Sequence, residues 1–416
     1  MGQILSTPVT DKYSEKGGDS DLVYGLSSMQ GWRVTMEDAH ATVLELKDTK
    51  GEPEKKKVAF FGVYDGHGGD KVAIYTGDNL HHIVARQEAF AKGDYGQALK
   101  DGFLSTDRAI LEDAALKHDS SGCTATTAIV SDGKVICANA GDSRTVLGVK
   151  GIAKPMSFDH KPQHEGERTR ICAAGGFVEA GRVNGNLALS RAIGDFDFKR
   201  SPYFPPEEQI VTAYPDVIEH ELTADDEFLI LACDGIWDCF LSQEVVEFVR
   251  RGIAEKQTLV GICENLIDNC LAPTSDLSGV GCDNMTVMVV ALLQGKTEEE
   301  WYNMVAERVE NGEGPAASRE AVERVAGEER EVTAQQLQQN AQAQQANSAS
   351  LALQQLLSSG ATITDENGMV VLKAENAAEL LAKVGLAPED VGQLVESGDL
   401  VEEDVEVSGD RITEEQ

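Results

Sequence analysis

The stretch VAFFGVYDGHGG, residues 58–69, joins an apolar run to a carboxylate and then to a glycine-rich turn. Its first seven residues are rich in β-branched and aromatic side chains and are apolar on both faces, which predicts a strand inside the fold. Asp65 follows this strand directly. A charge beside a core strand is costly unless something neutralises it. The position therefore calls for a compensating partner.

Two further stretches repeat this arrangement. EFLILACDGIWD, residues 227–238, carries Asp234 just after an apolar run, and GCDNMTVMVVALL, residues 281–293, carries Asp283 just before one. If the last strand runs antiparallel to the other two, all three carboxylates reach one rim of the fold. Converging carboxylates repel each other unless a cation lies between them. Oxygen ligands suit Mg²⁺ or Mn²⁺ rather than zinc, so the sequence predicts a hard-metal site.

Gly66 adds a second feature to this site. Without a side chain, its backbone carbonyl could approach a cation closely, and a second cation could share Asp65. Two ions about 3.5–4 Å apart can hold a hydroxide between them and clamp a phosphoryl group. An isolated Asp-Gly pair is more often a simple turn. Three aspartates at strand ends in one chain make that interpretation weaker.

The segment GWRVTMEDAHATV, residues 31–43, supplies further polar groups. Glu37 and Asp38 form an acidic pair that could hold metal-bound water, and Arg33 could bind a phosphate through two parallel hydrogen bonds. His67, two residues past the first carboxylate, could give a proton to a leaving alkoxide. Taken alone, such an arginine would be a surface residue and such a histidine a satisfied loop residue.

Strand-like and helix-like segments alternate between residues 21 and 294. The helices come in adjacent blocks, which favours α+β layers of antiparallel sheet over a parallel doubly wound fold. Ser242 is a predicted N-cap. Strands are expected at 58–64, 124–130, 134–140, 226–233 and 285–293, and helices at 94–117, 242–255 and 259–270.

The chain divides into four parts by composition. Residues 1–20 are polar and are expected to be a flexible segment, and residues 21–294 are expected to form the main folded domain, which carries the predicted site. Residues 295–311 are expected to form a helix that docks through Trp301. Residues 312–416 are acidic, Gln-rich and of low complexity, so a largely disordered tail is expected there.

Charge and cysteine content limit the function classes. The net charge is −35, and about half of it lies in residues 295–416, which hold 8 Lys and Arg against 26 Asp and Glu. Such a chain disfavours nucleic acid and anionic membranes as partners. The eight cysteines form no CxxC pair and no signal peptide is apparent, which indicates a cytoplasmic or nuclear protein. Gly2 and Ser6 match an N-myristoylation pattern, and a single acyl chain gives at most transient membrane contact.

Eight motifs occur in an order that resembles the type 2C metal-dependent protein phosphatase family, also called PPM, and specifically a fungal-type member with a long acidic tail. They cover about residues 20–310, and they are GWRVTMEDAH, YDGHGG, SGCTA, NAGDSR, DHKP, LALSRAIGD, ACDGIWD and GCDNMT. The resemblance implies a four-layer α-β-β-α sandwich, in which two antiparallel sheets are flanked by helix pairs. It also implies a monomeric enzyme that acts on phosphoproteins.

The resemblance assigns a role to each residue of the predicted site. It implies two Mn²⁺ or Mg²⁺ ions, with Asp65 bridging both, the Gly66 carbonyl binding one, and Asp234 and Asp283 binding the other. Glu37 and Asp38 match the acidic pair that binds metal or metal-held water. Arg33 matches the phosphate-binding arginine and His67 the general acid, while a hydroxide between the two ions attacks phosphorus.

Four other residues match positions with less defined roles. Asp142 and Asp238 match a third, weaker metal site that some relatives have. His160 and Arg182 lie in segments that resemble the flap bordering the cleft.

Two alternative functions remain open at this level. A nuclease or a small-molecule phosphatase could use the same carboxylates, although the acidity of the chain speaks against a nucleic-acid substrate. A scaffold that binds phosphoproteins without turnover is the other alternative, and the intact set of metal ligands argues against it.

Overall fold

The computed structural model describes most of the chain, namely residues 4–47, 57–275, 279–314, 362–366 and 369–373. The chain divides into two units, residues 1–329 and 330–416. The described residues of the second unit form one antiparallel hairpin of β17 (Thr362–Glu366) and β18 (Met369–Lys373). Apart from this hairpin and residues 312–314, the expected acidic tail lies outside the described residues, as does Gly2.

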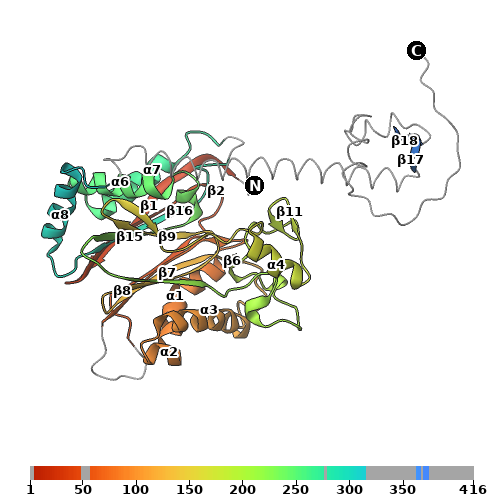
Figure 1. Ribbon diagram of the computed structural model, residues 1–416, viewed down its shortest axis with the longest axis horizontal. Coiled ribbons are helices and arrows are strands. Elements are labelled where there is room, and N and C mark those ends of the chain that lie inside the picture. Colours follow the sequence, from red (N-terminus) through yellow and green to blue (C-terminus); the bar gives the residue numbers. More distant parts are fainter. Residues whose placement is uncertain (1–3, 48–56, 276–278, 315–361, 367–368, 374–416) are drawn as a thin grey trace, which may run out of the picture. The chain divides into compact units, whose positions relative to one another are not determined.

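Two antiparallel sheets form the centre of the first unit (Figure 1). The larger sheet has the strand order β1-β2-β16-β15-β9-β10, and the smaller has the order β14-β8-β7-β4-β3. The strands of the larger sheet are β1 (Ile4–Gly18), β2 (Leu22–Arg33), β9 (Arg144–Val149), β10 (Ile152–Pro155), β15 (Asp226–Ala232) and β16 (Met285–Leu292). Those of the smaller sheet are β3 (Ala39–Val43), β4 (Val58–Tyr64), β7 (Ala125–Ser131), β8 (Lys134–Ala140) and β14 (Asp216–Glu221).

Helices cover the outer face of each sheet. The pair α1 (Lys71–Ala85) and α3 (Tyr95–Glu112), with the short α2 (Glu88–Ala91), packs on the smaller sheet. The helices α6 (Ser242–Ala254), α7 (Leu259–Cys270) and α8 (Glu298–Glu310) pack on the larger sheet. Figure 1 shows the resulting order of layers, helix, sheet, sheet and helix. The predicted four-layer sandwich is therefore confirmed.

The apolar pattern of the strands explains the two-sheet core. The strand β4 is buried along its whole length, because its side chains alternate between the helix layer and the opposite sheet. Phe60 packs with the helices, whereas Phe61 packs between the sheets against residues such as Leu231. The loop between β7 and β8 turns at Asp132 and Gly133, whose φ angles of 54° and 71° suit a tight hairpin.

The N-terminal segment differs from the prediction. Residues 1–20 were expected to be flexible, but residues 4–18 form β1, which pairs antiparallel with β2 along the edge of the larger sheet. The prediction was wrong because this segment is rich in polar side chains. An edge strand is partly exposed to solvent, so its sequence need not show the apolar pattern of a buried strand. The register places Ile4 opposite Arg33.

The beginning of α6 also differs from the prediction. The helix is capped at Leu241, and Ser242 is its first residue rather than its N-cap. The carboxylate of Glu244 accepts the Leu241 N–H at 2.9 Å. The Ser242 hydroxyl is engaged elsewhere, because it accepts a hydrogen bond from Arg144 Nη1 at 2.8 Å.

The helix α8 is fixed to the larger sheet by buried contacts. Trp301 is fully buried, and its Nε1 donates to the carbonyl of Glu227 in β15 at 2.9 Å. The buried Glu227 carboxylate pairs with Arg250 Nε at 3.0 Å and with Arg308 Nη1 at 3.1 Å. The segment from Glu298 to Glu310 is therefore part of the folded unit.

Between β10 and β14 the chain leaves the sheets and forms a separate segment over residues 156–215. It holds α4 (Glu165–Ala173), the strand pair β11 (Val178–Glu179) and β12 (Arg182–Val183), the strand β13 (Ile193–Gly194), and the 3₁₀ helices η1 (Phe196–Phe198) and η2 (Pro206–Glu208). The strand β13 pairs with β6 (Gly122–Cys123), which in turn pairs with β5 (Gly66–His67). This small sheet ties the segment to the glycine-rich turn after β4.

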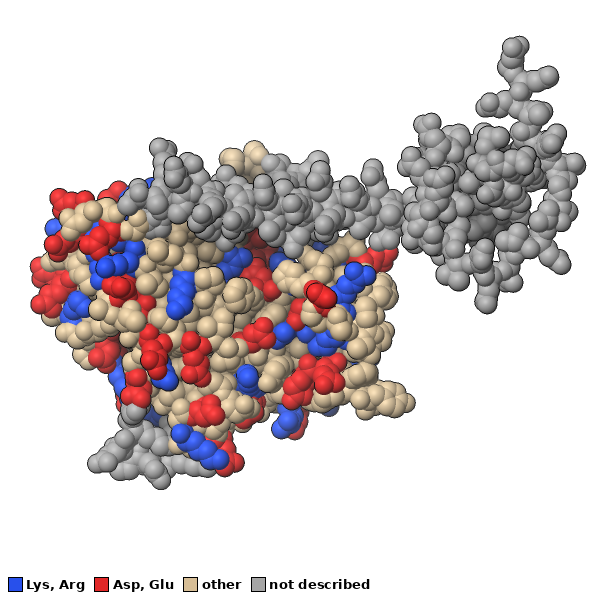
Figure 2. Space-filling model, in the orientation of Figure 1, with Lys and Arg blue, Asp and Glu red and all other residues tan. Residues whose placement is uncertain are grey.

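Charged side chains of both signs cover the outside of the folded unit. Figure 2 shows Lys and Arg interspersed with Asp and Glu over the described residues of the face it presents, without a continuous basic surface there. Across the described part of the chain, no helix is both long and apolar enough to cross a membrane.

Candidate metal centre

A cleft of about 750 Å³ lies at one end of the two sheets. The predicted residues that line it are Arg33, Glu37, Asp65, Gly66, His67, Asp142, Arg182, Asp234 and Asp283. They come from the ends of β2 and β4, from β5 and β12, from the loop after β8, from the start of the short helix α5 (Asp234–Trp237) and from the residues before β16. Segments distant in sequence thus converge because both sheets end here.

The backbone of Asp65 is held on both sides by Thr124. Its N–H donates to Thr124 Oγ1 at 3.2 Å, and its carbonyl accepts the Thr124 N–H at 2.9 Å. Gly66 follows, and a Cβ there would lie 2.3 Å from the carbonyl oxygen of Glu37. Only glycine allows these two chain segments to approach so closely. Glycine at position 66 therefore has two effects. It leaves the Gly66 carbonyl accessible, and it lets the segment with Glu37 and Asp38 pack beside Asp65.

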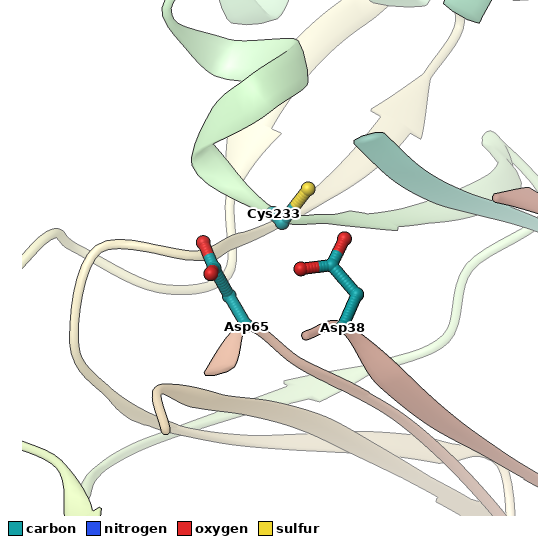
Figure 3. Close-up of side chains that lie close together, drawn as sticks. All are labelled: Asp38, Asp65 and Cys233. Atoms are coloured by element: carbon teal, nitrogen blue, oxygen red, sulfur yellow. The ribbon is translucent and has the colours of Figure 1, made fainter. Parts of the chain in front are cut away.

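Asp38 and Asp65 face each other across the floor of the site, with Cys233 above them (Figure 3). A ligand atom of each of the three residues lies within 4.8 Å of those of the other two. Asp38 Oδ2 accepts a hydrogen bond from Thr286 Oγ1 at 2.6 Å. Asp38 Oδ1 is buried and has no hydrogen-bond partner. A buried carboxylate oxygen left without a partner is a place where a cation fits.

Cys233 serves the backbone and does not act as a ligand. Its sulfur accepts the Thr286 N–H at 3.1 Å and lies 3.6 Å from the Asn284 carbonyl, to which the thiol can donate. Burial raises the pKa of this thiol well above its usual value, and the nearby Asp38 raises it further. The group therefore stays protonated, and a thiol is a poor partner for a hard cation.

Burial and neighbouring acids raise the pKa values of three carboxylates at this site. Burial raises the pKa of Asp65 well above its usual range, and the charges of Asp234 and Asp38 raise it further. Burial and the neighbouring Asp142 and Asp238 do the same for Asp234. Burial raises the pKa of Asp38 to about 7. A cation among these groups would reverse this effect, because it favours the charged form of each.

Asn284 organises the acidic pair, and the sequence analysis did not assign it a role. Its Oδ1 accepts the Glu37 N–H at 2.9 Å, and its Nδ2 donates to the carbonyls of Gln30 and Thr35 at 2.8 and 3.0 Å. The Glu37 carboxylate in turn accepts the Gly69 N–H at 3.1 Å. The position of Asn284 directly after Asp283, in the motif GCDNMT, was the available signal.

Arg33 lies at the edge of the cleft and is half-exposed. Its Nη2 donates to Asp283 Oδ2 at 2.6 Å. A guanidinium carries five N–H groups, so most remain available to another anion. The contact joins the expected phosphate-binding group to an expected metal ligand.

His67 forms a close pair with Asp195, a residue that the sequence analysis quoted in LALSRAIGD but gave no role. The His67 Nε2 and Asp195 Oδ2 atoms are 2.6 Å apart. Burial would lower the pKa of His67, but the charge of Asp195 outweighs it, so the pKa is raised. Asp195 thus favours the protonated form of His67, which is the form that can give up a proton.

The expected third metal site contains a lysine. The Lys161 ammonium forms an ion pair with Asp142. Burial would lower the pKa of Lys161, but Asp142, Asp234 and Asp238 together raise it. Asp238 lies one helical turn after Asp234. Asp142, Asp234 and Asp238 are close enough to act on one another electrostatically, and Lys161 contributes a positive charge to this group.

The two residues expected beside the flap have different positions. Arg182 is exposed, lines the cleft and donates to the Asn186 carbonyl at 2.6 Å. His160 is not among the cleft-lining residues. It is 4% exposed, accepts the Gly141 N–H through Nδ1 at 3.2 Å, and contacts Asp216 Oδ2 through Nε2 at 3.1 Å. Its contacts support the backbone directly before Asp142.

Comparisons with known proteins agree with this geometry. The family model described as Protein phosphatase 2C matches residues 22–278. The chain is 67% identical over 310 residues to protein phosphatase 2C homolog 2 of Aspergillus fumigatus, covering 73% of this chain and 72% of that one. It is 58% identical over 318 residues to protein phosphatase 2C homolog 2 of Schizosaccharomyces pombe, covering 76% and 85%.

A solved structure has the same fold. A phosphatase from a pathogenic strain of Toxoplasma gondii aligns with a TM-score of 0.56 and 26% identity, covering 68% of this chain and 95% of that one. The chain therefore belongs to the protein phosphatase 2C family, whose members are metal-dependent protein serine/threonine phosphatases. Phosphoproteins are the substrates of this enzyme class.

Proposed function

We propose that this chain hydrolyses phosphoserine and phosphothreonine in proteins by direct attack of a water-derived oxygen on phosphorus. The proposal rests on one observation above all. Asp65 and Asp234, whose pKa values are raised, line one cleft, and next to Asp65 a buried oxygen of Asp38 has no hydrogen-bond partner. The donor set consists of carboxylate and carbonyl oxygens, which fits Mn²⁺ or Mg²⁺.

Two ions would be held by the residues at the floor of the cleft. Asp65 would touch both, the Gly66 carbonyl and the acidic pair Glu37 and Asp38 would serve one side, and Asp234 with Asp283 the other. When bound, these cations would supply the nucleophilic oxygen and neutralise charge on the phosphoryl group. The hydrogen bonds of Thr124 with Asp65, and of Asn284 with Glu37, fix the backbone of these two residues without a metal ion.

Arg33 would orient the phosphate. Its guanidinium is tied to Asp283 on one side and half-exposed to the cleft on the other. The remaining N–H groups can meet two phosphoryl oxygens at once, which fixes the phosphate as well as attracting it. Arg182, across the same cleft, would add positive charge near the incoming phosphopeptide.

His67 would give a proton to the departing serine or threonine oxygen. An alkoxide is a poor leaving group, and a positioned acid accelerates such a step by about 10²–10⁴-fold. The imidazole lines the cleft, and Asp195 favours its protonated form. No cysteine of the cleft is available as a nucleophile, since the pKa of Cys233 is raised and its sulfur is occupied by backbone contacts.

A third, weaker ion at Asp142 and Asp238 would have to compete with Lys161. The ammonium already neutralises Asp142. A divalent ion there would displace this side chain, which lowers the affinity of the site. Replacing Lys161 with methionine is therefore expected to strengthen binding of a further ion, measured by calorimetry.

The proposed function is tested with a phosphothreonine peptide and the full chain. Release of phosphate is expected with Mn²⁺ or Mg²⁺ and not with EDTA. An oligonucleotide and a small sugar phosphate serve as competing substrates, and faster turnover of either would overturn the assignment. Binding of the phosphopeptide with Mn²⁺ present but without phosphate release would indicate a scaffold instead.

A further inference from the structure

The pair formed by His67 and Asp195 is built into the fold by the small sheet β13-β6-β5. His67 lies opposite Gly122 in one pairing, and Gly194 lies opposite the same Gly122 in the other. Asp195 follows Gly194 and therefore reaches past the central strand to the histidine. A Cβ at Gly122 would lie 2.3 Å from Asp195 Oδ2 and 2.7 Å from His67 Nε2. Glycine at this position thus leaves the room that the pair needs.

The backbone around Asp195 is held in place by contacts with α3 and with Lys199. Asp195 is 6% exposed and adopts φ of 52°, a left-handed conformation that non-glycine residues rarely take. The Gly194 N–H donates to Asp107 Oδ1 on α3 at 2.8 Å. Lys199 pairs with the other oxygen of Asp107 and also donates to the Ala192 carbonyl at 2.8 Å. Strained backbone persists only where surrounding contacts hold it in place, and it is common at functional sites.

The orientation of the imidazole follows from this pair. A carboxylate oxygen accepts, so the 2.6 Å contact commits the hydrogen of His67 Nε2 to Asp195. The opposite nitrogen, Nδ1, is then the one left for the leaving oxygen. His67 keeps part of its side chain exposed in the cleft, while Asp195 is closed off.

We infer that Asp195 is the positioning residue of the general acid, and that the proton leaves from Nδ1 of His67. This inference rests on the proposed function and extends it. In the step, a water-derived oxygen bonds to phosphorus while the bond between phosphorus and the serine or threonine oxygen breaks, and the electron pair of the broken bond stays on the serine or threonine oxygen. The oxygen takes the Nδ1 proton, which leaves a neutral imidazole with its Nε2–H still bound to Asp195. Solvent returns the proton to Nδ1.

The test compares two substrates that differ in their need for an acid. A phosphothreonine peptide has a poor leaving group, whereas p-nitrophenyl phosphate has a good one that departs without a proton. With Mn²⁺ present, Asp195→Asn is expected to lower kcat on the peptide about 10²-fold, with KM within about threefold and kcat on p-nitrophenyl phosphate within about fivefold. His67→Gln is expected to show the same pattern, and the double variant should be no slower than His67→Gln alone.

Matched controls separate positioning from a merely structural role. Asp197→Asn changes an exposed carboxylate two residues away, which pairs with Arg200 at the surface, and should leave both substrates unaffected. An equal loss on both substrates in Asp195→Asn, or additive losses in the double variant, would overturn the inference. If wild-type protein fails on the peptide, or His67→Gln shows no dependence on the leaving group, the proposed function itself fails. If only Asp195→Asn lacks that dependence, the function stands and the inference falls.

A measurement on the unaltered protein guards against variants that do not fold. In full-length protein labelled with ¹⁵N-histidine and loaded with Mg²⁺, the His67 signals are assigned by their loss in His67→Gln. A directly observed Nε2–H that is protected from exchange is expected. A neutral ring with its proton on Nδ1 alone and a bare Nε2 would contradict the inference.

Discussion

Two groups of enclosed carboxylates in this protein meet opposite surroundings. In the cleft, Asp38, Asp65 and Asp234 lie among other acids, and burial together with like charges raises their pKa values. In the segment over residues 156–215, Glu167 is also buried but lies between two arginines. Burial would raise its pKa, yet Arg191 and Arg170 lower it to about 2.

The geometry around Glu167 accounts for this contrast. Its two oxygens accept hydrogen bonds from Arg191 Nη2 at 2.7 Å, Arg170 Nη1 at 2.8 Å and Ser190 Oγ at 2.7 Å. Arg191 also pairs with Asp216, which contacts His160. We call these residues, with Glu167 at their centre, the Glu167 cluster. The fold supplies positive charge for this acid, whereas the cleft acids lie mainly among other acids. Under the proposed function, ions from solution would neutralise the cleft acids, so what neutralises an acid would distinguish the two groups.

The largest effect is expected from Asp65→Asn. Phosphatase activity with Mn²⁺ should fall at least about 10³-fold, because the residue would contact both ions. The melting temperature without metal should rise or stay unchanged, because a repelled carboxylate has been removed. Asp11→Asn, at an exposed position in β1, is the control and should change neither quantity. Retained activity would remove Asp65 from the site.

The reverse result is expected from Glu167→Gln. The folded state should lose about 3 kcal/mol of stability, because two enclosed arginines lose their shared partner. Urea unfolding measures this loss, and Glu165→Gln, an exposed position on the same helix, serves as the control. A stability equal to wild type would show that the cluster is not needed for the fold.

Metal removal should separate the two groups again. A ligand present at 100 times its Kd stabilises the folded state by about 2.7 kcal/mol. Mn²⁺ should therefore raise the melting temperature of wild type and of Glu167→Gln, and EDTA should reverse the rise. Asp65→Asn should show little of it. An equal rise in all three proteins would place the ions elsewhere.

The pH dependence of stability should have opposite signs in the two groups. The folded pKa of Glu167 is depressed to about 2, so its contribution is complete above its unfolded pKa of about 4.3 and is lost as pH falls towards 2. The pKa of Asp38 is raised to about 7, so metal-free protein should lose stability as pH rises from about 4 through 7. Glu167→Gln should flatten the acid side of the profile, and Asp38→Asn the neutral side, both followed by thermal unfolding in EDTA.

The smallest effect is expected from shortening the chain. Both groups lie before Gly314, and Glu313 still contributes, because its carbonyl accepts from Arg250 Nη1 at 2.7 Å. A chain that ends at Gly314 should keep activity on a phosphothreonine peptide within about twofold. A chain that ends before Trp301 should have a lower melting temperature. Without α8, the buried Glu227 would lose its ion pair with Arg308 and the hydrogen bond from Trp301. Loss of activity in the longer, folded fragment would assign the tail a catalytic role.

Apolar runs made much of the fold predictable. The strands at 58–64 and 134–140 match β4 and β8, because strands buried on both faces carry a continuous apolar signal. The edge strand β1 gave no such signal, and the Ser242 hydroxyl, which was expected to cap α6, instead accepts a hydrogen bond from Arg144, which is distant in sequence. Contacts of this kind exist only after folding, so no local pattern contains them.

The cleft was predictable for a similar reason. Asp65, Asp234 and Asp283 stood out because charges beside core strands are unusual, and each lies where its strand meets the cleft. Asp195, Asn284 and Lys161 act through neighbours that are distant in sequence. Their positions within recognisable motifs marked them as noteworthy, but only the three-dimensional structure shows what each one contacts.

The pairing of Ile4 with Arg33 brings the start of β1 to the edge of the cleft, because Arg33 lines that cleft. Ile4 is itself exposed. A fluorophore attached at this position should therefore respond when a ligand enters the cleft, and a bulky group attached there should hinder its entry.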